Sequence, residues 1–333
     1  MGLRKGALSR LDSRTLVLVM LRLAPLMLFA VLCVTFGVLS DRFLSLANFR
    51  NILSQSTHVA VMAIGMTFVL LVRGVDLSVG SVMYLVAVVM GLYLSDVSLF
   101  VSIPAIMLIG AAFGAINACF ITGLRIAPFI VTLATLFIGR GLALYLSETK
   151  MVFQSDTVQA LGQTSFFGLP WAIWIAAVVA AAAWITLTQT PYGRQIYAVG
   201  ADPDSAAKAG IRVQPIIFSV FCICATCAAI GALISASQVG AAAATFGSQE
   251  EFPVIAAAVL GGTSLFGGRG GVFGSIFGAV LVQTTANGLV MLNANPYLYP
   301  LVNSVIIFVA AWVDGRRRLM TERLERRKIR MEA

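Results

Sequence analysis

Long apolar runs separated by short polar segments dominate the chain. A helix needs about 20 mainly apolar residues to cross a bilayer, and fewer where it is broken inside protein. By that measure the pattern predicts about ten spans, at residues 16–39, 57–72, 77–94, 98–121, 127–146, 169–188, 214–237, 252–267, 271–292 and 297–313. Residues 41–55 carry an apolar stripe at helical spacing and are predicted to lie at the membrane interface. The predicted fold is an all-α polytopic membrane protein, with residues 1–333 forming one transmembrane domain.

Two glycine-rich segments interrupt the pattern at membrane depth. They are residues 73–81, RGVDLSVGS, and residues 261–271, GGTSLFGGRGG. Both contain Gly-x-x-Leu-x-x-Gly, and each follows a short predicted span and precedes a longer one. Paired glycine-interrupted segments in the two halves of a chain are typical of transporters with an internal, inverted repeat. The pattern therefore predicts such a repeat with broken helices.

The first interruption contains two charges, Arg73 and Asp76. An ionised side chain at the bilayer centre costs about 3 kcal/mol, so both should be paired, hydrated or near the interface. Their spacing would let them pair with each other if the turn is helical. Asp76 or Ser78 can also cap the next helix and leave its donor-rich N-terminus facing the break. The segment is either an ordinary polar connection or a broken helix that lines a polar path.

The longest mixed polar segment between two apolar blocks is residues 190–213. Asp202 is a good N-cap, Pro203 suits the first helical position, and Gly210 supplies a left-handed stop. The predicted helix is only about 10 Å long, too short to persist alone in water. It must therefore pack either on its own chain or on a separate soluble subunit.

Composition identifies an integral membrane protein, because only 11% of the residues are charged, against about 25% in soluble domains. The net charge of +9 includes eight Lys and Arg between Arg316 and Arg330, a clustering that signals topology rather than nucleic-acid binding. With ten spans, all the basic segments fall on one side, which the positive-inside rule makes cytoplasmic. These are the tail 1–15, Arg125, the segment 190–213 and the basic tail 315–333, which is expected to rest as a helix near anionic headgroups.

No catalytic or metal-binding set is evident in the sequence. The five cysteines lie in apolar runs, and Cys222, Cys224 and Cys227 have no fourth Cys or His nearby, which favours a packing role. The glycine-rich stretch 267–271 lacks the Gly-Lys-Ser/Thr ending of a phosphate loop. The chain is therefore not expected to be an enzyme, to bind a metal or cofactor, or to hydrolyse a nucleotide by itself.

Three motifs in order resemble the permease subunits of bacterial monosaccharide ABC importers, of the ribose, xylose and galactofuranose type. The residues that carry the resemblance are GMT at 65–67 with GVDLSVGS at 74–81; TPYGRQIYAVG at 190–200 with Ala206, Ala207, Gly210 and Ile211; and VLGGTS at 259–264 with Gly274 and Gly278. The stretch PFIVTL at 128–133 fits the family as well. Arg73 stands where this family usually has an uncharged residue, and Asp202 where it often has Asn.

The resemblance implies a multi-pass protein of the bacterial cytoplasmic membrane that works in a homodimer or heterodimer of permeases. Its implied partners are ABC ATPase subunits, which hold ATP and Mg, and a periplasmic or extracellular sugar-binding protein. It implies that residues 190–213 couple to the ATPase through Gly193, Arg194, Tyr197, Gly200, Asp202, Ala206, Ala207 and Gly210. The two breaks would supply a translocation path or gate with Gly74, Asp76, Ser78, Gly80, Gly262, Thr263 and Gly268.

Other functions fit the sequence less well. An ion-driven secondary transporter would place acidic or His residues within its spans, and Asp76 is the one strong candidate. A membrane-embedded enzyme would need a nucleophile and base or a metal set. Within the ABC class, the alternatives are permeases for branched-chain amino acids, nucleosides or a signalling sugar. The family places most selectivity in the binding protein, so the sequence does not name the sugar.

Overall fold

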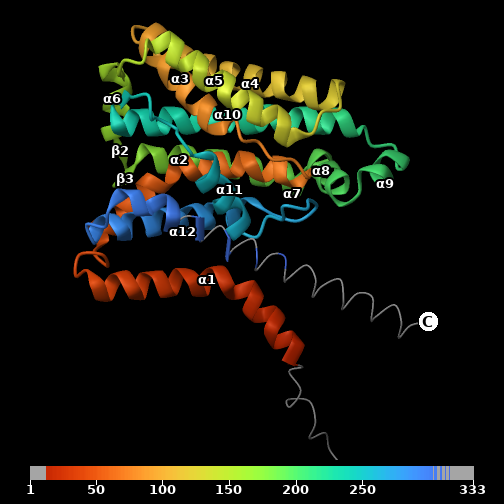
Figure 1. Ribbon diagram of the computed structural model, residues 1–333, viewed down its shortest axis with the longest axis horizontal. Coiled ribbons are helices and arrows are strands. Elements are labelled where there is room, and N and C mark those ends of the chain that lie inside the picture. Colours follow the sequence, from red (N-terminus) through yellow and green to blue (C-terminus); the bar gives the residue numbers. More distant parts are fainter. Residues whose placement is uncertain (1–12, 303, 306–307, 310–311, 313–314, 316–333) are drawn as a thin grey trace, which may run out of the picture.

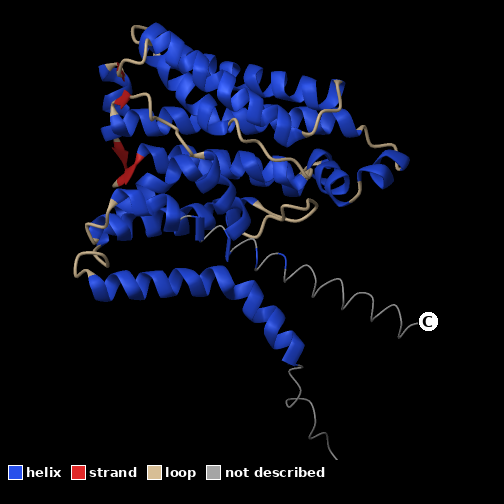
Figure 2. Ribbon diagram, in the orientation of Figure 1, coloured by secondary structure: helices blue, strands red, loops and turns tan. Residues whose placement is uncertain are grey.

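The computed structural model describes residues 13–302, 304–305, 308–309, 312 and 315. Figures 1 and 2 show elongated helices running side by side, with very short strands at one end. The helices are α1 (Ser13–Leu39), α2 (Leu46–Leu71), α3 (Val79–Tyr93), α4 (Leu99–Gly123), α5 (Pro128–Ser147), α6 (Asp156–Gln163), α7 (Trp171–Gln189), α8 (Pro191–Ala201), α9 (Pro203–Lys208), α10 (Val213–Val239), α11 (Glu251–Leu260), α12 (Val272–Met291) and the 3-10 turn η1 (Pro296–Leu298). The strands are β1 (Val152–Phe153), β2 (Ser165–Phe166), β3 (Leu169–Pro170) and β4 (Ala241–Ala242), paired antiparallel as β1–β4 and β2–β3.

Six described helices are long and apolar enough to cross a membrane: α2, α4, α5, α7, α10 and α12. Shorter apolar helices are α3, α11 and the Pro25–Leu39 part of α1. Each of the first nine predicted spans overlaps one of these helices, which confirms the all-α polytopic fold. The tenth predicted span, 297–313, and both terminal tails lie partly or wholly outside the described residues.

The predicted interfacial helix at 41–55 is wrong, because most of that segment is the first part of α2. Ser45 caps this helix by accepting a hydrogen bond from the Asn48 amide, and the helix then runs unbroken to Leu71. Its polar side chains contact α12 instead of lying on a bilayer surface. Asn48 Nδ2 donates to Asn287 Oδ1 at 2.9 Å, and Gln283 Nε2 donates to Gln55 Oε1 at 2.9 Å. Polar contacts between helices therefore extend α2 beyond its apolar run.

Glycines allow the central helices to approach at backbone distance. A Cβ at Gly114 of α4 would lie 2.5 Å from the Phe221 carbonyl oxygen of α10, and one at Gly65 of α2 would lie 2.7 Å from Cys227 Cβ. In α12, a Cβ at Gly278 would lie 1.9 Å from the Ala257 carbonyl oxygen of α11. Such small residues are characteristic of helix contacts in membranes, where packing replaces the hydrophobic effect as the driving force.

Helices α3 and α11 are too short to cross a bilayer alone. They have 15 and 10 residues, or about 22 and 15 Å at 1.5 Å per residue, against a hydrocarbon core of about 30 Å. Each follows a non-helical segment, residues 72–78 and 243–250 respectively, and both segments run along the face seen in Figure 1. In the first half, the long helix α2 precedes the break and the short α3 follows it, which reverses the predicted order of lengths.

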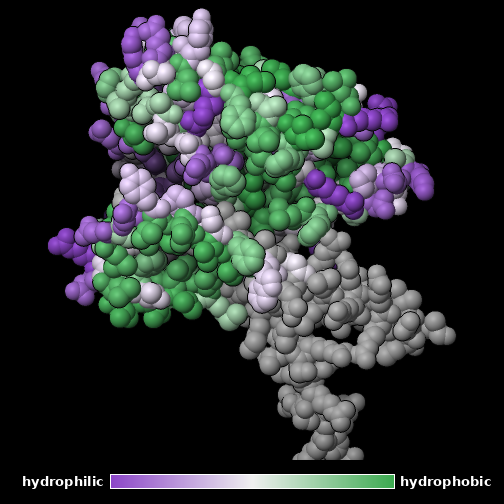
Figure 3. All heavy atoms as spheres, in the orientation of Figure 1, coloured by the Kyte–Doolittle hydropathy of each residue, from purple (hydrophilic) through white to green (hydrophobic). Residues whose placement is uncertain are grey.

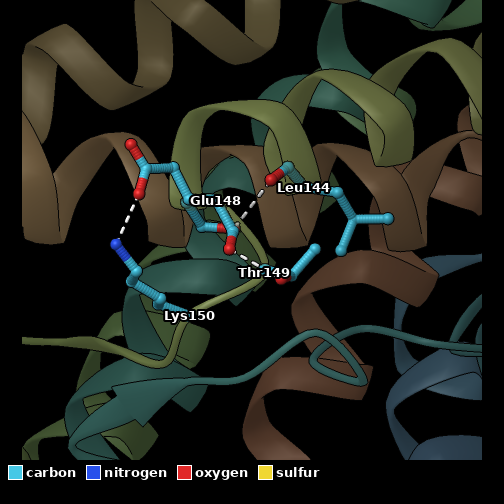
Figure 4. A network of polar contacts seen from close by, with 5 residues as sticks. Leu144, Glu148, Thr149 and Lys150 are labelled. Carbon is cyan, nitrogen blue, oxygen red and sulfur yellow. Dashed lines mark hydrogen bonds and ion pairs between the residues drawn. The ribbon is translucent and has the colours of Figure 1, made fainter.

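The two ends of the helix bundle differ in charge. Helices α4 and α10 run antiparallel, so the loop with Arg125 lies at the same end as α8 and α9, which bring Arg194 and Lys208 (Figure 1). The opposite end holds the paired strands and α6. There Glu148, at the end of α5, forms an exposed ion pair with Lys150, which lowers the pKa of the carboxyl (Figure 4). By the positive-inside rule the α8/α9 end is the expected cytoplasmic side, and this orientation stays a prediction.

Candidate functional site

Three segments that are distant in sequence meet at the α8/α9 end of the bundle. The Gly268 amide donates to the Leu71 carbonyl oxygen at the end of α2, at 2.9 Å. The Tyr197 hydroxyl of α8 donates to the Gly270 carbonyl oxygen at 2.8 Å. Gly200, near the end of α8, fits because a Cβ there would lie 1.8 Å from the Leu71 carbonyl oxygen. We call this meeting of α2, α8 and the loop 261–271 the basal junction.

Arg73, which follows α2, connects that helix to the end of α8 within the basal junction. Its Nε donates to the Gly200 carbonyl oxygen at 2.8 Å, and its Nη2 donates to the Ala201 carbonyl oxygen. These carbonyls belong to the C-terminus of α8. The helix dipole favours a cation there, and the guanidinium supplies donors to carbonyl oxygens that have no partner within the helix. The backbone of Arg73 is left-handed, with φ of 64°. The pairing of Arg73 with Asp76, which the sequence allowed for a helical turn, does not form, because the turn is not helical and the guanidinium binds the end of α8.

Asp76 is buried in the segment that leads from α2 to α3. Its Oδ1 accepts hydrogen bonds from the Ser78 amide at 2.9 Å and from the Ser78 hydroxyl at 2.6 Å. Asn117 of α4 donates through Nδ2 to the same Ser78 Oγ at 2.9 Å. Ser78 occupies the N-cap position of α3 but its side chain makes no capping bond. Asp76 thus organises the turn into α3, and α4 fixes that turn in place.

The segment 190–213 forms two helices, of which the sequence predicted only the second. As expected, Asp202 caps α9 by accepting from the Ser205 amide at 2.9 Å, and Gly210 ends it with φ of +86°. That hydrogen bond lowers the pKa of Asp202. The contribution of this cap to stability is full above the unfolded pKa of about 3.9 and is lost as the pH falls through the lower folded value. The missed helix α8 also has a sequence signal, since Thr190 caps the Gly193 amide and Pro191 follows.

The predicted coupling residues fall into a buried or half-buried group and an exposed group. Gly193, Gly200 and Ala206 are buried against their own chain, and Tyr197 is half-buried. Arg194, Asp202, Ala207 and Gly210 are exposed at the end of the bundle. The first group thus packs within the chain, and the second group lies on its surface.

The predicted path residues lie at two depths. Gly262, Thr263 and Gly268 belong to the basal junction, where Thr263 is buried and a cavity of about 510 Å³ opens between α7, α8, α12 and Pro25. Gly74 lies near the same end, at the turn that follows α2. Gly80, in the first turn of α3, instead packs against Gly247 in the segment before α11. The two glycine motifs therefore do not form a single site.

Valine at these four glycines should abolish transport. A Cβ at Gly80 would lie 2.5 Å from the Gly247 carbonyl oxygen, and one at Gly74 would lie 2.9 Å from Val69 Cγ1. Gly262 and Gly268 have φ of +92° and +70°, a backbone that valine adopts only with strain. Substrate uptake by cells that carry each variant is the measurement, with membrane content checked by immunoblot. Gly141→Val is the matched control because nothing lies within 4 Å of its Cβ position. Normal uptake in all four variants would refute this role.

The sequence prediction missed four polar residues inside apolar helices or beside them. They are His58 in α2, Arg140 in α5, and Glu250 and Glu251 at the start of α11. Arg140 donates to the carbonyl oxygens of Ala244 and Phe246 at 2.9 and 3.1 Å and lies over the Tyr84 ring. An ionisable side chain within a predicted span is rare and usually functional, and this signal could have found His58 and Arg140 but not Glu250 and Glu251, which precede the span predicted at 252–267.

Comparison with known proteins agrees with this architecture. The family model described as "Branched-chain amino acid transport system / permease component" matches residues 48–311. No solved structure matches the chain. The matched range includes the basal junction, both breaks and every helix from α3 to α12.

Curated relatives are similar over most of their length. The ribose import permease protein of Haemophilus influenzae is 34% identical over 291 residues, which is 86% of this chain and 90% of the relative. The D-allose transport system permease protein of Escherichia coli is 36% identical over 290 residues, 86% and 89% of the two chains. The autoinducer 2 import system permease protein of Photorhabdus laumondii is 34% identical over 302 residues, 89% and 90% of the two chains. The chain belongs to this family of ABC transporter permeases.

Proposed function

We propose that this chain is the membrane-spanning subunit of an importer that moves a monosaccharide into a bacterial cell across the inner membrane. A binding protein delivers the sugar, a second permease copy or a related permease completes the channel, and a separate ATPase supplies ATP hydrolysis with Mg. The substrate class rests on the ribose and allose permeases among the relatives. The observation that carries the mechanism is the basal junction, which joins two exposed short helices to the end of a central transmembrane helix.

The coupling follows from the contacts of the basal junction. Helix α9 has six residues, packs its buried Ala206 against its own chain and presents Ala207 to solvent, which leaves its outer face available to the ATPase. A displacement of α9 is transmitted to α8 through Asp202, which is both the C-cap of α8 and the N-cap of α9. It then reaches Leu71 of α2 through the close approach of Gly200 and the hydrogen bonds of Arg73. Movement of the ATPase thereby changes the position of α2 and of the break that follows it.

Ala207→Glu should uncouple the complex. The side chain is exposed, so the variant should fold and insert normally, while a large charge should block close approach of the ATPase. We expect the loaded binding protein to lose its stimulation of ATP hydrolysis by about tenfold, the effect of about 1.4 kcal/mol of lost contact energy. The measurement uses proteoliposomes with the full complex and D-ribose, D-allose or leucine as probes.

The matched control is Ala160→Glu, an exposed alanine of α6 at the opposite end of the bundle. It should leave stimulation and uptake unchanged. Normal stimulation in the Ala207→Glu complex would show that α9 packs only on its own chain. Uptake that needs an ion gradient instead of ATP would identify a secondary transporter, and uptake of leucine alone would replace the sugar by an amino acid.

A further inference from the structure

The half of α2 that starts at Leu46 is polar, and the half that ends at Leu71 is apolar. Asn51, Ser54, Gln55 and His58 are exposed or partly exposed, whereas every residue from Val59 to Leu71 is buried. His58 lies near the midpoint of this 26-residue helix, about 18 Å from either end. A polar strip therefore runs along α2 from the strand end of the bundle to mid-depth and stops at His58.

Glu250 reaches this midpoint from another part of the chain. Its Oε2 lies 4.0 Å from His58 Nε2, which is longer than a hydrogen bond. Both Glu250 Oε2 and His58 Nδ1 are buried and have no hydrogen-bond partner among the described residues. The segment 243–250 that carries Glu250 is non-helical, and Arg140 holds it by two backbone carbonyls. Two buried polar atoms at the end of the polar strip, Glu250 Oε2 and His58 Nδ1, therefore lack hydrogen-bond partners.

The N-termini of the two short helices face each other at the same place. Gly80 of α3 and Gly247, just before α11, each sit so close that a Cβ on either would lie 2.5 Å from the carbonyl oxygen of the other. Glu251 points across this contact, because its Oε2 would lie 2.7 Å from a Cβ at Gly80. Glu251 is only 8% exposed, and its own backbone amide and the nearby charge of Arg140 act on its carboxylate, so the unpartnered buried atoms at this place are Glu250 Oε2 and His58 Nδ1. A buried acceptor without a partner is costly unless a ligand or water fills the need.

Exposed polar residues complete the cluster. Ser248 and Gln249 are exposed immediately before Glu250. Figure 3 shows hydrophilic residues in a hollow of this face with apolar surface on both sides. Irregular backbone and polar side chains at membrane depth cannot face lipid, and they occur only where they line water or meet protein. We define the midpoint cluster as His58, Ser248, Gln249, Glu250 and Glu251, and its position requires either water or protein beside it.

We propose that the midpoint cluster is a transient contact site for the hydroxyl groups of the sugar during its passage. This inference rests on the proposed function. Carboxylates of Glu250 and Glu251 accept hydrogen bonds from hydroxyls, and the helix N-termini favour oxygen atoms. The buried apolar half of α2 beyond His58 closes the path on the α8/α9 side. Movement of α2 at the basal junction would then open this closed half while the sugar rests on the cluster.

The test is uptake by the full complex in proteoliposomes, with D-ribose, D-allose and the 2-deoxy analogue of each as probes. Glu250→Gln and Glu251→Gln should each lower uptake of the hydroxylated sugars by about tenfold, as loss of a charged hydrogen-bond acceptor does. Stimulation of ATP hydrolysis by the loaded binding protein should persist. Uptake of the deoxy analogue should fall less, so the preference of the complex for the parent sugar should shrink. If the glutamates have a purely structural role, the variants should lower uptake of the parent sugar and of its deoxy analogue equally.

Glu148→Gln is the matched control, since Glu148 is exposed at the strand end and its ion-pair partner among the described residues is the neighbouring Lys150. A second measurement does not depend on the folding of the glutamate variants. In a background whose five native cysteines are alanines, Gln249→Cys should react with a membrane-impermeant thiol reagent from the outside. Loaded binding protein and ATP should slow that reaction.

Three results would overturn the proposal. The first is unchanged uptake and sugar preference in both glutamate variants. The second is a disulfide that joins two permease copies through Gln249→Cys, which would make the cluster a subunit contact. The third is a wild-type complex with ATPase stimulation and uptake of leucine but of no sugar, which overturns the proposed substrate together with this site. Intact sugar uptake by the wild type with unaffected variants rejects the site alone.

Discussion

Gly200→Val should abolish uptake and ATPase stimulation together while the protein still inserts into the membrane. A Cβ at this position would lie 1.8 Å from the Leu71 carbonyl oxygen and 2.6 Å from the Gly268 amide nitrogen. Both are backbone atoms, so no side-chain rotation can relieve the clash, and overpacking of this kind costs about 1–3 kcal/mol or more. The basal junction must separate, and α8 then loses its contact with α2. We expect the loss of transport to exceed a hundredfold, since about 2.7 kcal/mol corresponds to that factor.

Uptake and ATP hydrolysis in reconstituted complexes measure this effect, and immunoblots of membranes check insertion. Gly123→Val is the control, because nothing lies within 4 Å of a Cβ at that position. A Gly200→Val complex that transports normally would mean that α8 moves independently of α2, and the coupling route through the basal junction would be wrong.

Arg73→Ala should weaken coupling without removing the close backbone contact at Gly200. The change removes two charge-assisted hydrogen bonds to the Gly200 and Ala201 carbonyl oxygens, and such bonds contribute about 1.5–3 kcal/mol. We expect stimulated ATP hydrolysis to continue at a reduced level and sugar uptake to fall by about tenfold. Arg73→Lys should recover only part of the loss, since an ammonium group lacks the planar fork that serves two carbonyls.

The control for this prediction is Arg50→Ala, an exposed arginine at the other end of the same helix α2. It should leave the ratio of sugar taken up to ATP hydrolysed unchanged. An unchanged ratio in Arg73→Ala as well would assign Arg73 to helix capping alone.

Apolar length was a good guide to the spanning helices and a poor guide to where they are interrupted. The predicted span 214–237 nearly coincides with α10, which is apolar over most of its length and carries no charge. The predicted span 252–267 instead ends at Leu260, because Gly261 and Gly262 begin a loop that returns to α12. The first part of α2 was assigned to the interface because of its apolar stripe at helical spacing, although its polar residues have partners on other helices, such as Asn287 for Asn48. Partners on other helices are invisible to a local pattern.

The same limit explains the outcome at the candidate site. The spacing alone allowed Arg73 to pair with Asp76. In the structure Arg73 donates hydrogen bonds to the end of α8, and Asp76 accepts one from Ser78. Local rules did succeed where the chemistry is local, as in the capping of α9 by Asp202 and its end at Gly210. The facing N-termini of α3 and α11 depend on long-range packing, so no nearby residues could have revealed that Glu251 points at Gly80.

The shortness of α11 also bears on how the chain enters the membrane during synthesis. A helix of 10 residues leaves one end of its backbone in hydrocarbon unless protein surrounds it, so it cannot be inserted as a separate unit. It can be accommodated only with α12, whose Gly274 and Gly278 contact its backbone directly, and against α2, which is made much earlier. Helix α11 must therefore remain in the insertion machinery until α12 has emerged. A ribosome stalled shortly after Leu260 would leave α11 outside the bilayer.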